Sequence, residues 1–227
     1  MQVKFIERKM LAQHVWEYCF TPASQIRYVP GQYAQFSFPS TAATATALQE
    51  KPYRTFTLSS HPDDNSVRFL TRLDPPLSHY KNLLAALQPG DLMRMSEPLG
   101  DVVLPRLATT PLVFVAQGIA LASYLSMLTE CAAAKKAHAI TLIWARQRED
   151  DPLAQCIPNN LPLLQRVDFH YPVSVGASTV LPHIQASSLI YLSGSQTFVE
   201  TLGDDLESSG VSRSRLIYDY YEGYPEL

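Results

Sequence analysis

The sequence changes character about halfway along its 227 residues. Before residue 108 no long helical period occurs, and short runs rich in Val, Phe, Tyr and Thr alternate with Pro and Gly breaks. After Pro111, apolar runs alternate with helical segments. The first part therefore has the pattern of an all-β domain and the second that of strands alternating with helices. This change predicts two domains, 1–108 and 109–227.

The first half reads as an antiparallel β-barrel. Each apolar run there is bounded by turn residues, at a spacing typical of a small Greek-key barrel. The predicted strands lie within residues 32–39, 53–60, 66–73 and 91–98. One short helix is predicted within 79–91, ending at Pro89-Gly90.

The second half reads as an α/β domain with a doubly wound parallel sheet. Near-continuous apolar runs are typical of strands covered on both faces, and they occur at 112–116, 140–145, 167–173, 189–194 and 215–220. Helices are predicted after the first strand, to about Lys136, and at 197–210. Ligands bind beyond the carboxyl ends of such strands, so 116–120 and 193–196 are candidate functional turns.

Charge and cysteine usage exclude several functions. A net charge of −3 lacks the basic footprint of a nucleic-acid binder. The three cysteines and six histidines form no metal-ligand spacing, so no metal site is predicted. The first ten residues lack the apolar core of a secretory signal, and polar residues interrupt 111–128, which favours strand, turn and helix over a membrane span. We expect a cytoplasmic protein.

Several segments together resemble, in the correct order, the landmarks of the ferredoxin-NADP reductase family. In the first half they are Pro30-Gly31-Gln32-Tyr33, Arg54-Thr55-Phe56-Thr57, Pro89-Gly90-Asp91 and Pro98-Leu99-Gly100. In the second half they are 116–128, 191–196 and 219–224. The resemblance extends over nearly the whole chain, and it implies a flavin-binding barrel followed by an NAD(P)-binding α/β domain.

The resemblance assigns flavin roles to the first half. Arg54 would bind a flavin phosphate, Phe56 would stack beside the isoalloxazine, and Thr57 would reach its N5 edge. The alternative from the residues alone is that Arg54 lies on the surface and Phe56 in the core. Further cofactor-binding candidates are Thr71, Arg72 and Ser78. The family's glycine is absent before Ser78, but FAD remains favoured over FMN.

The pyridine-nucleotide motifs depart from the family pattern. Gly118 and Gly194 stand at the expected turns, but Gln117 and Ala120 replace glycines, and Ser193 replaces a cysteine. These changes indicate weak or altered NAD(P)H use.

Other expected contacts in this half come from charged and aromatic side chains. Arg146 and Arg148 are candidates for a nucleotide phosphate, or else belong to a solvated turn. Tyr221 is the aromatic expected over the flavin, and Asp219 a polar neighbour of N5; a packed tyrosine cluster is the alternative. Thr57, Ser193 and Tyr221 are the expected catalytic residues.

The leading hypothesis is a flavoprotein oxidoreductase that passes electrons from NAD(P)H through FAD to a separate acceptor, such as ferredoxin, flavodoxin or a small molecule. One alternative is a flavin-binding electron-transfer or interaction subunit with impaired NAD(P)H use. Another is a flavin reductase that uses free flavin.

Overall fold

A computed structural model describes residues 1–39, 52–133, 138–146, 150–161, 163–170 and 175–221. The chain divides into two compact units, Met1–Val103 and Leu104–Leu227. The sequence pattern places the boundary a few residues later, after residue 108. The expected strand from 167 to 173 and the helix end near Lys136 lie partly outside the described residues.

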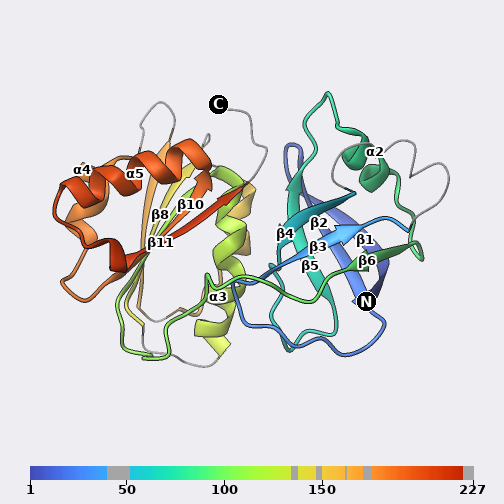
Figure 1. Cartoon of the computed structure of the whole chain (residues 1–227), viewed down its shortest axis with the longest axis horizontal. Coiled ribbons are helices and arrows are strands. Elements are labelled where there is room, and N and C mark those ends of the chain that lie inside the picture. The colour runs from blue at the N-terminus through green and yellow to red at the C-terminus, as the bar shows by residue number, and fades with distance from the viewer. Residues whose placement is uncertain (40–51, 134–137, 147–149, 162, 171–174, 222–227) are drawn as a thin grey trace. The chain divides into compact units, whose positions relative to one another are not determined.

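The first unit is a six-stranded antiparallel sheet in the order β4-β3-β6-β1-β2-β5, with one short helix (Figure 1). Its two end strands meet, because the Ser59 amide that follows β4 donates to the Arg68 carbonyl of β5 at 2.8 Å. This contact brings the sheet round into the expected barrel. Its elements are β1 (Gln2–Ala12), β2 (Val15–Pro22), β3 (Tyr33–Ser37), β4 (Tyr53–Thr57), β5 (Val67–Arg72), α2 (His79–Ala86) and β6 (Leu92–Met95).

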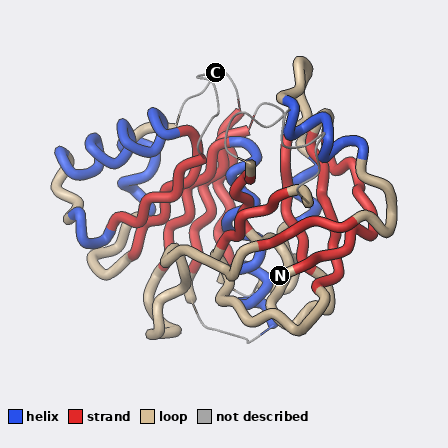
Figure 2. Tube along the Cα trace, turned by 45° about the vertical axis from the view of Figure 1, so that its right-hand side comes forward, coloured by secondary structure: helices blue, strands red, loops and turns tan. Residues whose placement is uncertain are grey.

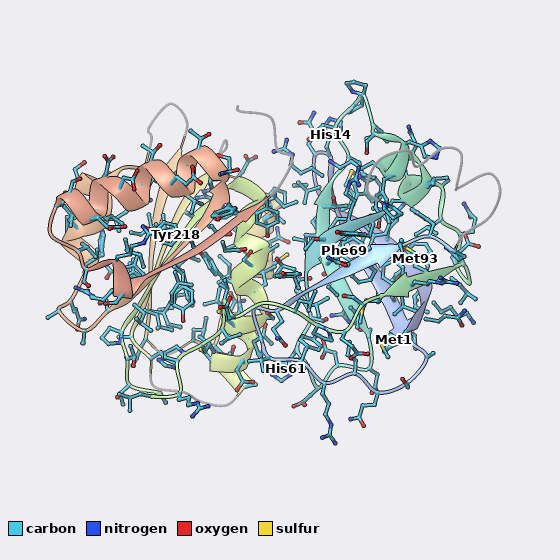
Figure 3. All side chains as sticks on the ribbon, in the orientation of Figure 1. Met1, His14, His61, Phe69, Met93 and Tyr218 are labelled. Carbon is cyan, nitrogen blue, oxygen red and sulfur yellow. The ribbon has the colours of Figure 1, made fainter. Side chains whose placement is uncertain are left out.

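Aromatic rings fill the barrel around Phe69. Its side chain is fully buried, and its ring centre lies 4.0 Å from that of Phe56 and 4.8 Å from that of Phe36 (Figure 3). Tyr18 and Phe20 from β2 complete the cluster at 5.5 and 5.6 Å. Successive strand residues face opposite sides, so the alternating aromatics of β2, β3 and β5 all point inward.

Helix α2 is shorter than the pattern of residues 79–91 predicts. Leu87 has already left the helical conformation, with a φ of −52° and a ψ of 136°. The next residues form a turn in which the Gln88 amide donates to the Asp91 carboxylate at 2.7 Å. Gly90 then takes a φ of 102°, which is unstrained only for glycine.

The second unit contains a five-stranded parallel sheet in the order β11-β10-β7-β8-β9. Its strands are β7 (Leu112–Gln117), β8 (Ile140–Arg146), β9 (Leu164–His170), β10 (Leu189–Ser195) and β11 (Leu216–Tyr221). Its α-helices are α3 (Ala122–Ala133), α4 (Ala177–Val180) and α5 (Gln196–Ser208). Short 3-10 turns are η1 (Gly118–Leu121), η2 (Pro152–Cys156), η3 (Leu181–His183) and η4 (Arg213–Arg215).

Helices cover both faces of this sheet, as the alternation along β7 shows. Val113 and Val115 belong to the same buried cluster as Val199 and Leu202 of α5. Phe114, between them, stacks on Tyr124 of α3 with ring centres 4.5 Å apart. Figures 1 and 2 show α3 and α5 on either side of the strands. The doubly wound α/β fold expected from the sequence is therefore confirmed.

Within the described part of the chain, no helix has both the length and the apolar character needed to cross a bilayer.

The aromatic cluster predicts a large stability effect at its centre. Phe69→Ala would leave a cavity among four other rings, so we expect the free energy of unfolding of the first unit to fall by about 3–5 kcal/mol. Met10, on the same sheet, has 59% of its surface exposed, so Met10→Ala should change it by less than about 0.5 kcal/mol. Urea unfolding followed by circular dichroism tests both, and equal effects would contradict the assigned core.

Candidate functional site

The two turns predicted to carry function follow neighbouring strands. Strand β7 pairs with β10 on one side and β8 on the other, with Ala116 opposite Ser193. After β7 the chain continues to β8 on one side of the pair, and after β10 it continues to β11 on the other side. This arrangement is the topological switch point at which open parallel sheets bind ligands, and it brings 116–120 and 193–196 to one crevice.

A hydrogen bond from Trp144 fixes the turn after β7. Gly118 has a φ of 56°, and its carbonyl accepts a hydrogen bond from Trp144 Nε1 at 2.9 Å. An added Cβ at Gly118 would meet no atom within 4 Å. Ala120 is buried, so its methyl group faces the interior and not the crevice. Of the two replaced glycines, only Gln117 therefore projects a side chain toward the neighbouring strand.

Gln117 reaches across to the end of β10. Its Oε1 accepts hydrogen bonds from the Ser195 amide at 3.3 Å and from Ser195 Oγ at 3.1 Å. Ser195 Oγ in turn accepts the Phe198 amide at 3.3 Å and so caps α5. A Cβ at Gly194 would come within 2.6 Å of the Phe198 ring and 3.1 Å of Gln117 Cβ. The space over Gly194 is thus filled by the protein's own side chains.

A buried polar cluster lies at the same edge of the sheet. Ser193 Oγ donates to Asp219 Oδ2 at 2.8 Å and lies 3.3 Å from Ser123 Oγ. The Ser123 and Tyr221 hydroxyls are 2.8 Å apart. The structure therefore brings Ser193, Asp219 and Tyr221 together. It adds Ser123, which the sequence marks only as a polar interruption of an apolar segment.

Burial controls the protonation of this cluster. It raises the pKa of Asp219 above its ordinary value, while hydrogen bonds from Ser123 and Ser193 favour the carboxylate and oppose that effect. The pKa of Tyr124, behind the cluster, is raised by complete burial and further by Asp219 and Tyr221. Its hydroxyl donates to the Val115 carbonyl at 2.9 Å. Burial thus outweighs the two hydrogen bonds, and the pKa of Asp219 is raised on balance.

Arg146 does not lie in a solvated turn. It is only 9% exposed, and its guanidinium lies over the Trp144 ring at 5.2 Å from the ring centre. That placement corrects the solvated-turn alternative for this residue. Arg148, the second arginine considered for a nucleotide phosphate, lies outside the described residues.

In the first unit, the Arg54–Thr57 motif occupies the end strand β4. Phe56 is half-buried and stacks on Phe69 with only 7° between the ring planes. The Arg54 guanidinium lies over the Tyr80 ring at 5.3 Å and donates to the Tyr53 carbonyl at 3.0 Å. Thr57 is 9% exposed. Phe56 is thus a boundary residue with one face on the core.

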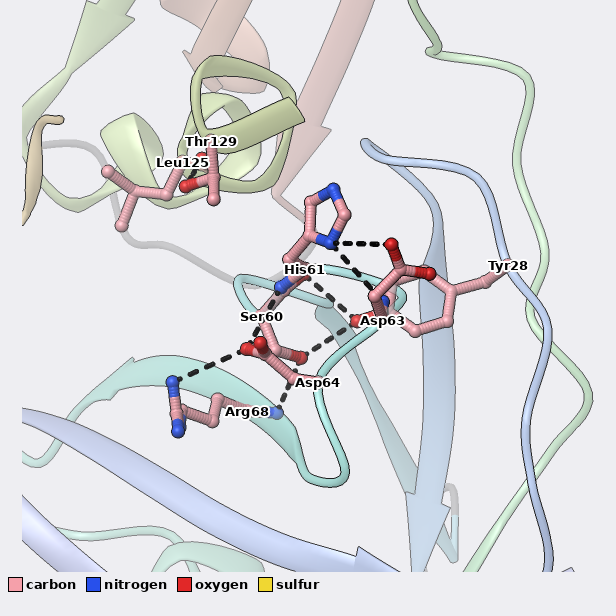
Figure 4. A network of polar contacts seen from close by, with 8 residues as sticks. All are labelled: Tyr28, Ser60, His61, Asp63, Asp64, Arg68, Leu125 and Thr129. Atoms are coloured by element: carbon pink, nitrogen blue, oxygen red, sulfur yellow. Dashed lines mark hydrogen bonds and ion pairs between the residues drawn. The ribbon is translucent and has the colours of Figure 1, made fainter. Parts of the chain in front are cut away.

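The connection that follows Thr57 is fixed by a polar network (Figure 4). The Tyr28 hydroxyl donates to the Ser60 carbonyl at 2.9 Å, and the Arg68 amide donates to Ser60 Oγ at 3.0 Å. The His61 amide donates to the Asp64 carboxylate at 3.3 Å. Burial raises the pKa of Tyr28 to about 12, so its hydroxyl stays protonated and the end of β4 stays anchored.

The charges of Arg54 on β4 and Arg72 on β5 both act on Lys81 of α2. The pKa of Lys81 is lowered, chiefly by burial, and the charges of Arg72 and Arg54 add to that effect against the opposing Asp74 carboxylate. Arg72 donates to both Asp74 carboxylate oxygens, at 2.9 and 3.4 Å. Sequence reasoning missed Lys81, although its position in the first turn after Ser78 is a usable signal. We call Arg54, Arg72 and Lys81 the cationic cluster.

Ser78 begins the helix that carries this lysine. Its Oγ accepts the Lys81 amide at 3.3 Å, and its side chain is otherwise exposed. Thr71, by contrast, is 4% exposed, whereas its neighbour Arg72 reaches Asp74. Adjacent strand residues face opposite sides, so Thr71 and Arg72 do not converge on one ligand. Ser78 and the cationic cluster form the more open, charged part of the candidate site.

No protein-family model matches the chain. Among curated proteins it is similar to flavohemoprotein A of Dictyostelium discoideum, at 21% identity over 95% of this chain and 59% of that protein. It is also similar to the toluate 1,2-dioxygenase electron transfer component of Pseudomonas putida, at 26% identity over 87% of this chain and 60% of that protein. The chain therefore spans about three fifths of these relatives' length.

Solved structures show the same fold. The flavohemoglobin of Malassezia yamatoensis, with bound FAD and heme, superposes with a TM-score of 0.82 at 20% identity, over 97% of this chain and 59% of that one. The FAD/NAD binding domain of a Vibrio cholerae nitric oxide dioxygenase gives 0.76 at 18% identity over 97% and 98%. The ferredoxin-NADP+ reductase of Neisseria gonorrhoeae, with FAD and NADP, gives 0.74 at 15% identity over 97% and 98%.

The chain thus has the fold of the ferredoxin-NADP reductase-like proteins, an antiparallel barrel followed by a doubly wound α/β unit. The fold expected from the sequence resemblance is confirmed.

The raised pKa of Asp219 predicts pH-dependent stability. Because the folded-state pKa lies above the ordinary 3.8, protonated Asp219 favours the fold at acid pH, and this contribution is lost as pH rises through the raised pKa. An asparagine at this position would still accept the Ser193 hydrogen without titrating, so Asp219→Asn should gain stability relative to wild type as pH rises. Urea midpoints from about pH 4 to pH 8 measure this difference.

The exposed Asp204 on α5 provides the matched control. Asp204→Asn should retain the wild-type pH profile. Parallel profiles for Asp219→Asn and wild type would show that Asp219 does not titrate differently in the folded chain.

Proposed function

We propose that this chain is an FAD-dependent NAD(P)H oxidoreductase that passes electrons through FAD to a separate acceptor. The observation that carries the proposal is that Arg54 and the half-buried Phe56, both on β4, lie 5.3 and 6.3 Å from the Tyr80 ring, in a fold shared with FAD-binding reductases. A flavin phosphate and an aromatic ring system require this combination of charge and apolar surface.

The candidate residues of the first unit each have a proposed role in binding the flavin. The Arg54 guanidinium offers two parallel donors to a phosphate, and Lys81 adds a point charge. Ser78 and the first amides of α2 contribute the positive end of a helix. Phe56 presents its open face to the flavin ring, and Thr57 ends the same strand. Arg72 forms an ion pair with Asp74, and Thr71 is buried within strand β5.

The lowered pKa of Lys81 supports the fit to a dinucleotide. Cations that crowd one another are stabilised when an anion binds between them. FAD carries two phosphates and FMN one, so Arg54 and Lys81 together favour FAD, while the charge of Arg72 is opposed by Asp74. Bound FAD supplies the chemistry of accepting a hydride and releasing electrons; the protein supplies binding and orientation.

The second unit is proposed to hold NAD(P)H at the switch point. Gly118 and Gly194 provide the backbone, and Ser193 and Tyr221 provide hydroxyls beside Asp219. Arg146, stacked over Trp144, is the proposed cation on the β8 side. The Gln117 contacts to Ser195 do not fit a phosphate at the same amide. They favour a second candidate function, a flavin-binding electron-transfer component with impaired NAD(P)H use.

The acceptor and the cellular location complete the proposal. We propose a separate acceptor, either a small molecule or an electron-transfer protein such as ferredoxin or flavodoxin. Cys19, Cys131 and Cys156 are few and lie far apart in the sequence, in keeping with a reducing compartment, and we propose the cytoplasm.

Absorbance of the purified protein tests the two candidate functions. We expect flavin absorbance that bleaches when NADPH or NADH is added without oxygen. Retained flavin that neither nucleotide bleaches would favour the electron-transfer component. A protein that binds no added FAD and oxidises neither nucleotide would refute both.

Removing one cation from the cluster should weaken flavin binding. Charge-assisted hydrogen bonds contribute about 1.5–3 kcal/mol each, so Arg54→Ala and Lys81→Ala should each raise the Kd for FAD about 10- to 100-fold. Arg94 on β6 is exposed, so Arg94→Ala is the control and should leave the Kd unchanged. Equal Kd values for all three variants and wild type, by fluorescence titration, would mean that the phosphate site lies elsewhere.

A further inference from the structure

Gln117 occupies the position in the switch-point crevice where a ligand would contact α5. Its Oε1 accepts both the Ser195 amide and the Ser195 hydroxyl, at 3.3 and 3.1 Å. Ser195 is the N-cap of the 13-residue helix α5, at the end where the backbone presents partial positive charge. A side-chain carbonyl oxygen therefore makes the contact that a phosphate oxygen would make.

The space next to the Gly194 backbone is filled by side chains of the chain itself. A Cβ at Gly194 would lie 3.1 Å from Gln117 Cβ, 3.2 Å from Gln117 Oε1 and 2.6 Å from the Phe198 ring. Without a Cβ of its own, Gly194 lets Gln117 and Phe198 close over the strand end. If the Gln117 amide moved away, the Ser195 amide and hydroxyl would lose their acceptor, while the Phe198 ring would still cover Gly194.

The position of Gln117 is well defined on the strand side. It is the last residue of β7 and pairs with Ala145 of β8. The next carbonyl, that of Gly118, is held by Trp144 Nε1 at 2.9 Å. The backbone is thus fixed on both sides, so movement of this side chain is a rotamer change and needs no rearrangement of the turn.

We infer that Gln117 sets the pyridine-nucleotide affinity of this chain, by holding its side-chain amide over the α5 N-terminus where a nucleotide phosphate would bind. The inference rests on the proposed function, since it assigns the nucleotide to this crevice. A nucleotide must displace two hydrogen bonds before it can form its own. Gln117 is therefore a specificity-determining residue that competes with the ligand from within the chain.

Three variants at one position and one control test the inference. Gln117→Ala removes the amide, keeps Cβ, and should bind NADP+ or NAD+ about 10- to 100-fold more tightly than wild type, the effect of two neutral hydrogen bonds. Gln117→Glu should bind more weakly than wild type, because its carboxylate favours the helix N-terminus and repels phosphate. Gln117→Asn, one methylene shorter, should fall between alanine and wild type. Gln185→Ala, at an exposed position of the same unit, should match wild type.

Isothermal titration calorimetry with NADP+ and NAD+ gives the Kd values, and flavin absorbance is recorded on the same samples. Tighter binding by Gln117→Ala with weaker binding by Gln117→Glu supports the inference. Equal affinity of wild type and Gln117→Ala, or no binding by any variant, overturns it. In either of those cases retained flavin would leave the flavin half of the proposed function standing, whereas loss of both flavin and nucleotide binding would refute the proposed function itself.

Discussion

The parallel pairing of β7 with β10 is the interaction on which the second unit depends. It joins the two halves of the sheet and places Ala116 opposite Ser193. Every polar group of that candidate site lies within a few residues of this pairing, including Gln117, Ser195 and the Ser193–Asp219 contact. A shift in register would separate Gln117 from Ser195 and would bring strand residues of the wrong face to the crevice.

The first unit is organised by a different constraint, the meeting of its two end strands. Phe56 and Phe69 stack across that junction, and the Ser60 turn fixes the connection between the strands. Arg54 is thereby held two residues from the stack, on the side of α2 that carries Tyr80 and Lys81. Apolar packing thus decides where the charges gather. The proposed phosphate site would be positioned by the core, not by a glycine-rich loop.

The sequence predicted the elements whose periodicity is strong. The apolar runs of β7, β8 and β10 and the period of α5 led directly to the doubly wound sheet. The long strands β1 and β2 were not singled out. Charged residues such as Lys4 and Arg8 make β1 poor in the β-branched and aromatic residues that mark a strand, and its stability comes from pairing with β2 and β6.

The contacts within the candidate site were harder to predict from the sequence than the fold. Replacement of glycine by Gln117 indicated reduced space in the crevice, but not that its amide would bind Ser195. Lys81 escaped notice because it is an ordinary residue of its helix. Ser123 was noticed as a polar residue in an apolar segment, but only tertiary packing brings it beside Tyr221. Ala120 was noted as a replaced glycine, but not that the 3-10 turn directs its methyl group inward.

The two tryptophans are divided between the two units, and their environments differ. Trp16 lies half-buried on β2 beneath the Arg8 guanidinium, at 5.2 Å, whereas Trp144 is fully buried and donates to Gly118. Intrinsic fluorescence therefore contains one reporter for each unit. The emission of Trp144 arises from an indole bonded to the turn next to Gln117, so the chain carries its own optical probe of that turn, separable from the barrel by a single Trp16→Phe exchange.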